Sequence, residues 1–343
     1  MVVVTEPATR RERRASSKKR RLRIVLISIG SVLALLIAGV GVYAFSLAQQ
    51  FDSAIKIDDA FPDDALRPPV AEIEGPAPQN ILLLGSDTRG SIAGALEGAK
   101  GTRSDTMMIV HVSGDRQSIQ VMSLMRDFWV DIPGHGKAKL NAALAYGGIP
   151  LAVQTIEGII DSRIDHVAIV DFEGFEGITN ALGGVTVDNP TAFTSTDAYH
   201  FRFDKGPIRL DGKMALTFVR ERHAFVDGDY TRVRNQQLFI KAVMRDTLSK
   251  ETLTNPVTIS NLVGAIAPFM AVDEGLNSGY AASLGFELRD IRVDDVTFFT
   301  MPTLGTGREG SQSIVRVNWD EVAKIQAAFK DDTLDAYVPP TRP

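Results

Sequence analysis

Beyond residue 79, hydrophobic positions alternate between short continuous runs and helical spacing, a pattern that predicts strands interleaved with helices. Apolar runs typical of buried strands occupy residues 80–85, 106–113, 118–124, 166–171 and 296–301. Periodic segments typical of helices occupy residues 141–146, 151–160, 173–182, 211–219, 232–248 and 320–330. Interleaving of this kind is typical of α/β proteins, so we expect a layered α-β-α domain with a central mixed sheet over residues 80–330.

A longer apolar run precedes this domain. Residues 24–48 are 25 consecutive positions without a charged side chain. A helix of this length spans a hydrocarbon core of roughly 30 Å. Nine lysines and arginines lie in residues 1–23, so the positive-inside rule predicts a single-pass anchor in the cell membrane with a cytoplasmic N-terminus and an extracellular main domain. A cleavable signal peptide is the alternative, although its apolar core is usually only about 7–15 residues long.

Charge and composition divide the rest of the chain. Without the basic segment 1–23, the chain has 28 basic and 40 acidic residues, a net charge of about −12. The acidic, proline-bearing stretch 49–79 predicts a juxtamembrane spacer with a short helix near residues 49–57, and residues 331–343 predict a loose C-terminal tail. A basic N-terminal arm would suit DNA binding, but the apolar run behind it argues against nucleic acid as a partner. The chain has no cysteine, which excludes disulfides and thiol chemistry.

The densest cluster of basic side chains lies in residues 220–234. It comprises Arg220, Arg222, His223, Arg232 and Arg234. Arginine offers a rigid fork of donors that suits phosphate oxygens, although a solvated basic surface fits this segment equally well when it is taken alone. Helical spacing over 232–248 puts Arg232 and Gln236 on one face and turns Arg234 away from it. Arg220 and Arg222 cannot share a helix face, so both reach one site only if the helix ends near Val219.

Polar side chains also stand at the ends of the predicted strands. Asp87 follows residues 80–85, Arg103 and Asp105 precede 106–113, and Arg126 follows 118–124. Loops at strand ends are where open α/β sheets bind ligands. Two carboxylates at neighbouring strand ends can share a hard cation such as Mg²⁺, which completes its shell with phosphate oxygens and water. Each motif alone also fits an ordinary turn, cap or ion pair.

In order and spacing, these segments together resemble the LytR-CpsA-Psr family of membrane-anchored cell-wall proteins over about residues 79–249. The resemblance is carried by GSDTR, RSDTMMIV, S-x-x-RD-x-x-V-x-IPG, K-x-NAALAYGG, VDFEGF…NALGGV-x-V, LDG-x-x-AL-x-FVRER and GDY-x-R-x-x-NQQ. The chain departs from the family at Met125, where proline is usual, and at Phe128, where a small polar residue is common.

The resemblance implies a phosphotransferase that moves a glycan phosphate from a polyprenyl-pyrophosphate-linked glycopolymer to peptidoglycan. It implies that Asp87 and Asp105 hold Mg²⁺ or Mn²⁺, and that the prenyl chain lies in an apolar pocket between sheet and helices. The apolar residues of 141–182 and 214–243 suit the lining of such a pocket, although ordinary core packing predicts the same residues. The residues that it implies for pyrophosphate binding are Arg103, Arg126, Arg220, Arg222, Arg232 and Gln236. The residues that it implies for catalysis are Arg103, Asp105, Arg126 and Arg220. A pyrophosphatase that uses water as acceptor, and a non-catalytic carrier-binding or regulatory membrane protein, are the alternatives.

Overall fold

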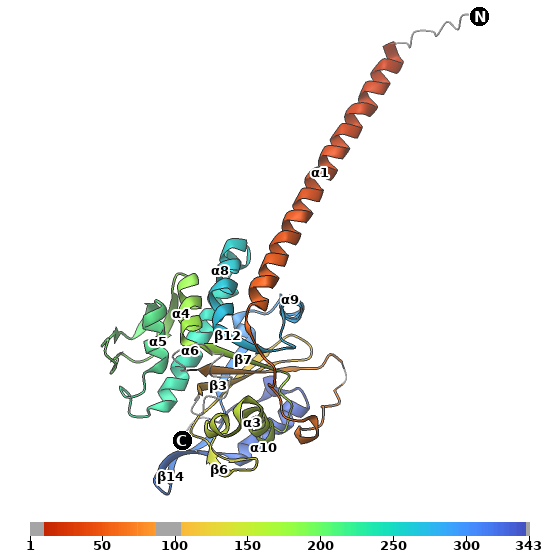
Figure 1. Cartoon of the computed structure of the whole chain (residues 1–343). Coiled ribbons are helices and arrows are strands. Elements are labelled where there is room, and N and C mark those ends of the chain that lie inside the picture. Colours follow the sequence, from red (N-terminus) through yellow and green to blue (C-terminus); the bar gives the residue numbers. More distant parts are fainter. Residues whose placement is uncertain (1–9, 74, 87–103, 341–343) are drawn as a thin grey trace, which may run out of the picture. The chain divides into compact units, whose positions relative to one another are not determined.

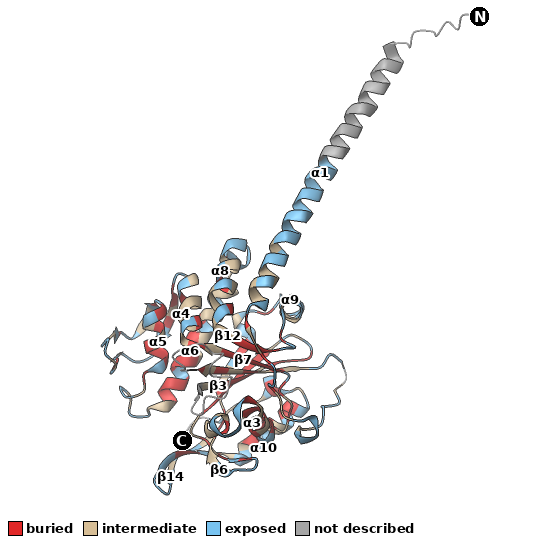
Figure 2. Ribbon diagram, in the orientation of Figure 1, coloured by how far each residue is buried: buried red, intermediate tan, exposed pale blue. Residues whose placement is uncertain are grey.

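The computed structural model describes residues 10–73, 75–86 and 104–340, without the side chains of 10–28, 104 and 105 (Figure 1). It divides into two compact units, Met1–Gln49 and Gln50–Pro343. The helix α1 (Arg10–Asp52) contains the apolar stretch Ile29–Asp52, which is long enough to cross a membrane and has no part buried within the protein (Figure 2). The predicted candidate membrane span is therefore confirmed as an unburied apolar helix.

A seven-stranded mixed sheet forms the centre of the second unit. In spatial order its strands are β1 (Ile55–Ile57), β12 (Met270–Asp273), β7 (His166–Asp171), β2 (Gln79–Ser86), β3 (Ser104–Val112), β4 (Ile119–Leu124) and β13 (Val296–Thr300). The pairs β1–β12, β2–β7 and β4–β13 are parallel, whereas β7–β12, β2–β3 and β3–β4 are antiparallel. This order confirms the predicted mixed sheet.

Helices cover both faces of the sheet (Figures 1 and 2). The helices are α3 (Ala142–Ile160), α4 (Phe172–Ala181), α5 (Gly212–Arg220), α6 (Asp229–Thr247), α7 (Lys250–Leu253), α8 (Pro256–Ile266), α9 (Ser278–Glu287) and α10 (Trp319–Lys330). Met107 and Met122 join a core with α3 and α10, whereas Met108 and Val121, one position along each strand, face α6 and α9. Since successive strand residues point to opposite faces, one sheet supports two cores. The predicted α-β-α layering is confirmed.

The strands and helices found from the sequence agree with the structure within a few residues. The predicted break between 141–146 and 151–160 is present inside α3, where Gly147 and Gly148 leave helical geometry and Gly148 has a φ of 67°. Glycine adopts this left-handed conformation without steric cost. Four two-stranded antiparallel sheets were not predicted from the sequence. They pair β5 (Trp129–Ile132) with β6 (Gly136–Lys139), β8 (Val185–Asn189) with β11 (Gly206–Leu210), β9 (Phe193–Thr194) with β10 (Arg202–Phe203), and β14 (Thr303–Glu309) with β15 (Gln312–Val317).

Two predictions about the flanking segments are wrong. The helix expected near residues 49–57 ends at Asp52, and Ile55–Ile57 pairs with β12 as an edge strand of the sheet. The segment 49–79 is therefore part of the folded unit and more than a spacer. The tail is also ordered up to residue 340, because Leu334 is buried in the core and Asp332 accepts a hydrogen bond from the backbone N–H of Gly114 at 2.8 Å.

An ion pair shows that the segment 49–79 contributes to stability. Arg67 Nη2 lies 2.6 Å from Glu157 Oε1, and the side chain of Glu157 is 1% exposed. Arg67→Ala should lower the free energy of unfolding by about 3–5 kcal/mol, because it leaves a buried carboxylate without its cation. Urea unfolding of the full chain in detergent micelles measures this loss. Arg202→Ala is the matched control, since its pair with Asp204 is solvent-exposed and should cost less than about 1 kcal/mol. Equal losses in the two variants would contradict the prediction.

Candidate functional site

Several strand ends meet at one edge of the sheet, which we call the strand-end edge. The register pairs Ser86, the last residue of β2, with Ser104 at the start of β3 and with Asp171 at the end of β7. Leu124 at the end of β4 lies opposite Met107 on β3, so β4 ends at the same edge. The motifs that the sequence placed at separate strand ends therefore converge in the structure.

The register also fixes the chain around the predicted metal ligands. Gly85 pairs with Thr106 and Ser86 with Ser104, so Asp105 is the extra residue of a β-bulge. Asp87 and Arg103 lie outside the described residues, as does the side chain of Asp105. The backbone of Asp105 nevertheless lies beside Ser86, the residue directly before Asp87. Two acidic positions at neighbouring strand ends fit the ligand set of a hard cation.

One carboxylate joins three of the predicted arginines. Asp229 begins α6, and its Oδ2 lies 3.0 Å from Arg232 Nη2 and 3.5 Å from Arg126 Nε. Its Oδ1 lies 3.7 Å from Arg222 Nη1. We call Asp229 with these three residues the arginine cluster. The neighbouring Asp127 lies between two cations: its Oδ1 is 3.1 Å from Lys139 Nζ, and its Oδ2 is 3.9 Å from Arg126 Nε. Counted over the described side chains, the cluster has three positive charges and one negative charge, which suits a doubly charged anion such as a pyrophosphate diester.

Arg220 lies at the same edge but outside the arginine cluster. Its guanidinium carbon is 4.2 Å from the centre of the Phe172 ring, a cation–π contact. Phe172 directly follows Asp171, which pairs with Ser86 at the end of β2. The side chain of Arg220 is exposed, and no carboxylate within the described part of the chain forms an ion pair with it. Its donors therefore remain available to an anion near the end of β2.

The buried side chain of Glu221 fixes the backbone between Arg220 and Arg222 and in the loop that follows. Helix α5 ends at Arg220, and Glu221 adopts an extended conformation, as the prediction for this segment requires. Glu221 accepts hydrogen bonds from the backbone N–H groups of Thr196 at 2.6 Å, His223 at 2.7 Å and Arg222 at 2.8 Å. Burial raises the pKa of Glu221, but the hydrogen bonds from Thr196, Ala224 and His223 together lower it below its usual value.

The stability of this loop should depend on pH. The pKa of Glu221 in the folded state lies below its ordinary value of 4.5, so its contribution to stability is fully present above that value. The contribution is lost as the pH falls through the folded-state pKa. Glu221→Gln should therefore lower the melting temperature at pH 7, and the difference from the unaltered protein should shrink between pH 4.5 and 3. Melting curves across this range test it, with the exposed Glu309→Gln as the control. A difference that stays constant down to pH 3 would contradict the assignment.

Helix α6 divides its polar side chains as the spacing predicts. Arg232 is buried, whereas Arg234 is exposed and its Nη2 lies 2.7 Å from Asp227 Oδ2. Gln236 is buried and donates to the backbone carbonyl of Val219 at 3.4 Å, so it supports the end of α5. A role for Gln236 in pyrophosphate binding stays a prediction. Gln237 donates to the hydroxyl of Ser123 at 2.8 Å and fixes α6 against β4 near the strand-end edge.

The two departures from the family pattern hold the turn that carries Arg126. Met125 and Phe128 are both fully buried in the core beneath α3. The backbone N–H of Phe128 donates to the carbonyl of Met125 at 3.0 Å, which closes a turn around Arg126 and Asp127. Two apolar side chains thus fix the base of this turn, and the charged pair lies at its tip.

The apolar residues expected around a prenyl chain belong to packed cores in the structure. Those of 141–182 contribute to the core beneath α3, for example Ala152 and Ile156. Those of 214–243 form a second core with Phe218 and Phe239. Two histidines are also buried within the fold, where His111 contacts Asp332 and His166 contacts Asp273.

Two residues of the site had no role assigned from the sequence. Asp229 lies before the helix predicted over 232–248, and its helical spacing to Arg232 becomes apparent only because α6 begins at Asp229 in the structure. Its contacts with Arg126 and Arg222 depend on the tertiary fold. The hydrogen bonds that Glu221 accepts from Thr196 likewise come from a loop 25 residues earlier in the chain.

A three-layer α/β domain with arginines from separate segments at a strand-end edge is a fold and site suited to binding phosphate groups. The chain belongs to the LytR_cpsA_psr family, whose match covers residues 44–331. This membership confirms the resemblance found in the motifs.

Two relatives and one solved structure illustrate the similarity. The polyisoprenyl-teichoic acid–peptidoglycan teichoic acid transferase TagU of Bacillus cereus (strain AH820) is 34% identical over 233 residues, 67% of this chain and 73% of that protein. The TagU of Enterococcus faecalis (strain ATCC 700802 / V583) is 29% identical over 320 residues, 92% of this chain and 98% of that protein. The LytR-Csp2A-Psr enzyme from Actinomyces oris has a similar fold, with a TM-score of 0.60, 23% identity and coverage of 80% and 96% of the two chains.

Proposed function

We propose that the protein transfers a glycan phosphate from a polyprenyl-pyrophosphate-linked glycopolymer to peptidoglycan. The observation that carries this proposal is the arginine cluster, whose surplus positive charge lies at the strand-end edge. Family membership supports it, as do relatives named for the transfer of teichoic acid to peptidoglycan. The polymer that this chain transfers is, like teichoic acid, a glycopolymer of the cell wall.

The arginines position the pyrophosphate and stabilise its charge. Phosphoryl transfer asks a protein mainly for positioning and charge neutralisation, and donors fixed in advance need no reorganisation during the reaction. Arg126, Arg222 and Arg232 are held in place by one carboxylate, so their orientation exists before the substrate binds. Arg220, at the end of α5, contacts Phe172 near the end of β2, and we expect it to bind the phosphate as well.

In the proposed step, an acceptor hydroxyl oxygen of peptidoglycan forms a bond to the phosphorus next to the glycan. The bond from this phosphorus to the bridging oxygen breaks, and polyprenyl phosphate leaves with the bonding electron pair. The arginine cluster stabilises the charge that develops on the leaving phosphate. The hydroxyl proton goes to a carboxylate at the strand-end edge, for which Asp105 is our candidate. No covalent intermediate with the protein is required.

Asp87 and Asp105 would hold a divalent cation, Mg²⁺ or Mn²⁺, and Arg103 would bind the pyrophosphate. The support is the register, which brings the bulge at Asp105 next to the residue that precedes Asp87. When bound, the cation supplies positive charge to the phosphate oxygens. The chelator EDTA should therefore reduce transfer at least tenfold, and added Mg²⁺ should restore it.

The proposed reaction fits a protein tethered to the membrane that holds its lipid-linked donor. The apolar stretch of α1 supports such a tether. We further propose that residues 1–23 are cytoplasmic and that the catalytic unit lies outside the cell, where peptidoglycan is the acceptor. Protease treatment of intact cells tests this orientation, because only an external unit would be digested.

The decisive experiment uses the full chain in detergent micelles with a synthetic polyprenyl-pyrophosphoryl glycan, Mg²⁺ and peptidoglycan strands. The expected products are polyprenyl phosphate and peptidoglycan that carries the glycan phosphate. Free glycan phosphate as the sole product would replace transfer with hydrolysis. Tight donor binding without turnover in the presence of acceptor would leave a carrier-binding protein.

A further inference from the structure

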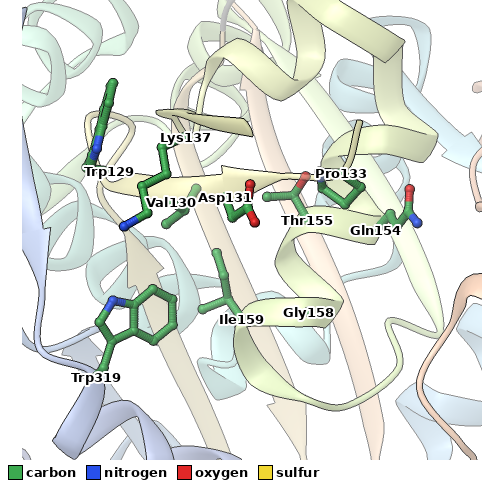
Figure 3. A pocket seen from close by; sticks show the side chains of 10 residues that line it. All are labelled: Trp129, Val130, Asp131, Pro133, Lys137, Gln154, Thr155, Gly158, Ile159 and Trp319. Atoms are coloured by element: carbon green, nitrogen blue, oxygen red, sulfur yellow. The ribbon is translucent and has the colours of Figure 1, made fainter. Parts of the chain in front are cut away.

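A pocket separate from the arginine cluster contains both tryptophans of the chain (Figure 3). It has a volume of about 400 Å³ and lies between the β5–β6 hairpin, helix α3 and the first residue of α10. Trp129 comes from the hairpin, and Trp319 begins α10 and is half exposed. Figure 3 shows the amine of Lys137 extending into the space between the two indole groups. The volume is that of a small-molecule site, and the aromatic walls are accessible from solvent.

Two opposite charges point into this pocket without neutralising each other. Asp131 and Lys137 are directly opposite in the hairpin register, where oppositely charged side chains usually pair. Within the described part of the chain, neither residue forms an ion pair. In Figure 3, Lys137 extends toward the tryptophans and the carboxylate of Asp131 toward Thr155 on α3. The pocket therefore offers a donor and an acceptor at separate points on its wall.

These features select the chemistry of the ligand. A purely apolar ligand would desolvate both charges without replacing their hydrogen bonds with water, which is costly. A phosphate would approach the carboxylate of Asp131. A pyranose ring has an apolar C–H face that stacks on indole and a rim of hydroxyl groups that bonds to carboxylate and ammonium. An acetamido sugar adds an amide that both donates and accepts.

We propose that this pocket binds an acetamido-pyranose unit of the acceptor glycan strand. The assignment to a sugar rests on the pocket alone, and its assignment to the acceptor rests on the proposed transfer function. Trp129 follows Arg126 by three residues, so their Cα atoms are at most roughly 11 Å apart. Lys139, opposite Trp129 in the hairpin, bonds to Asp127 beside Arg126. The hairpin that forms one wall of the pocket is thus tied to the turn that carries Arg126, an arrangement suited to a polymer that occupies both sites.

Tryptophan fluorescence reports on this pocket directly, because the chain has two tryptophans and both line it. The full chain in detergent micelles is titrated with a soluble tetrasaccharide of alternating N-acetylglucosamine and N-acetylmuramic acid. We expect a saturable change in emission. Trp319→Ala, read through Trp129, should weaken binding at least tenfold, and Asp131→Asn should weaken it severalfold without affecting folding, because Asp131 is exposed. Tyr199→Ala, which removes another half-exposed aromatic side chain, is the control and should bind normally.

Several outcomes would overturn the proposal. One is tryptophan emission that shows no saturable change at millimolar tetrasaccharide. Another is tetrasaccharide affinity that is unchanged in both Trp319→Ala and Asp131→Asn. Binding of the donor glycan in place of the tetrasaccharide would overturn the assignment to the acceptor. The KM for the lipid-linked donor should be unchanged in Trp319→Ala, whereas the KM for peptidoglycan should rise; a rise in the donor KM alone would overturn the assignment to the acceptor. If the chain binds the tetrasaccharide but never releases polyprenyl phosphate, the pocket stands and the proposed transfer function fails.

Discussion

Arg126→Ala should lower the rate of glycan-phosphate transfer by about 10²–10³-fold, the usual cost of removing one positioned charge donor from a transition-state site. Arg126 lies in the arginine cluster and two residues beyond the end of strand β4, so its guanidinium is held at the edge where the other motif residues converge. The loss should appear in the initial rate of polyprenyl phosphate release at saturating acceptor. The donor KM should also rise, because the site loses one positive charge.

The fold should survive this substitution. The turn is anchored by Met125 and Phe128, which remain buried, and the side chain of Arg126 contributes little to either core. Arg234→Ala is the matched control, because Arg234 lies on α6 close to Arg232 but pairs with Asp227 on the exposed side. Its rate should stay within twofold of the unaltered protein. An equal loss in the two variants, or a full rate in Arg126→Ala, would show that general basic charge rather than the cluster governs activity.

The sequence predicts an element well when its hydrophobic pattern matches the way in which the element is buried. Strand β4 is buried along its whole length, and the continuous apolar run that marks it reflects burial on both of its faces. Helix α5 is similarly clear because its apolar positions face one core and Asp211 caps its first turn through the N–H of Met214. Local pattern and tertiary position agree in both elements.

The elements that the sequence missed lie where local pattern and tertiary position diverge. The three residues of β1 carry too little pattern to reveal a strand, and their pairing with β12 joins positions more than 200 residues apart. The hairpin β5–β6 contains Asp131, Lys137 and Lys139, whose charges obscure an alternating pattern. The same reasoning applies to the site. Single arginines can be found by their motifs, but the carboxylate that joins Arg126, Arg222 and Arg232 can be found only from their distances.

Asp229→Asn should reduce the turnover number for transfer by about 10²-fold without raising the donor KM. The substitution preserves side-chain volume but removes the charge that holds three guanidinium groups in place. Small displacements of positioning groups can cost 10²-fold in rate. The net charge of the site becomes more positive by one, so attraction for the pyrophosphate does not weaken. Arg232, 4% exposed, loses its ion pair with Asp229, and we expect about 1–3 kcal/mol of lost stability.

The donor KM should rise in Arg126→Ala but not in Asp229→Asn. This difference distinguishes a role in positioning the phosphate from simple attraction of its charge. If the cluster acted only as a positive surface, Asp229→Asn would bind the donor more tightly and react at least as fast as the unaltered protein. A positioning role for Asp229 requires tighter or equal binding together with a slower reaction. Asp227→Asn is the control, since Asp227 lies two residues earlier and pairs with the exposed Arg234. Its turnover number and KM should remain near those of the unaltered protein, so a comparable loss there would assign the effect of Asp229→Asn to the start of helix α6 as a whole.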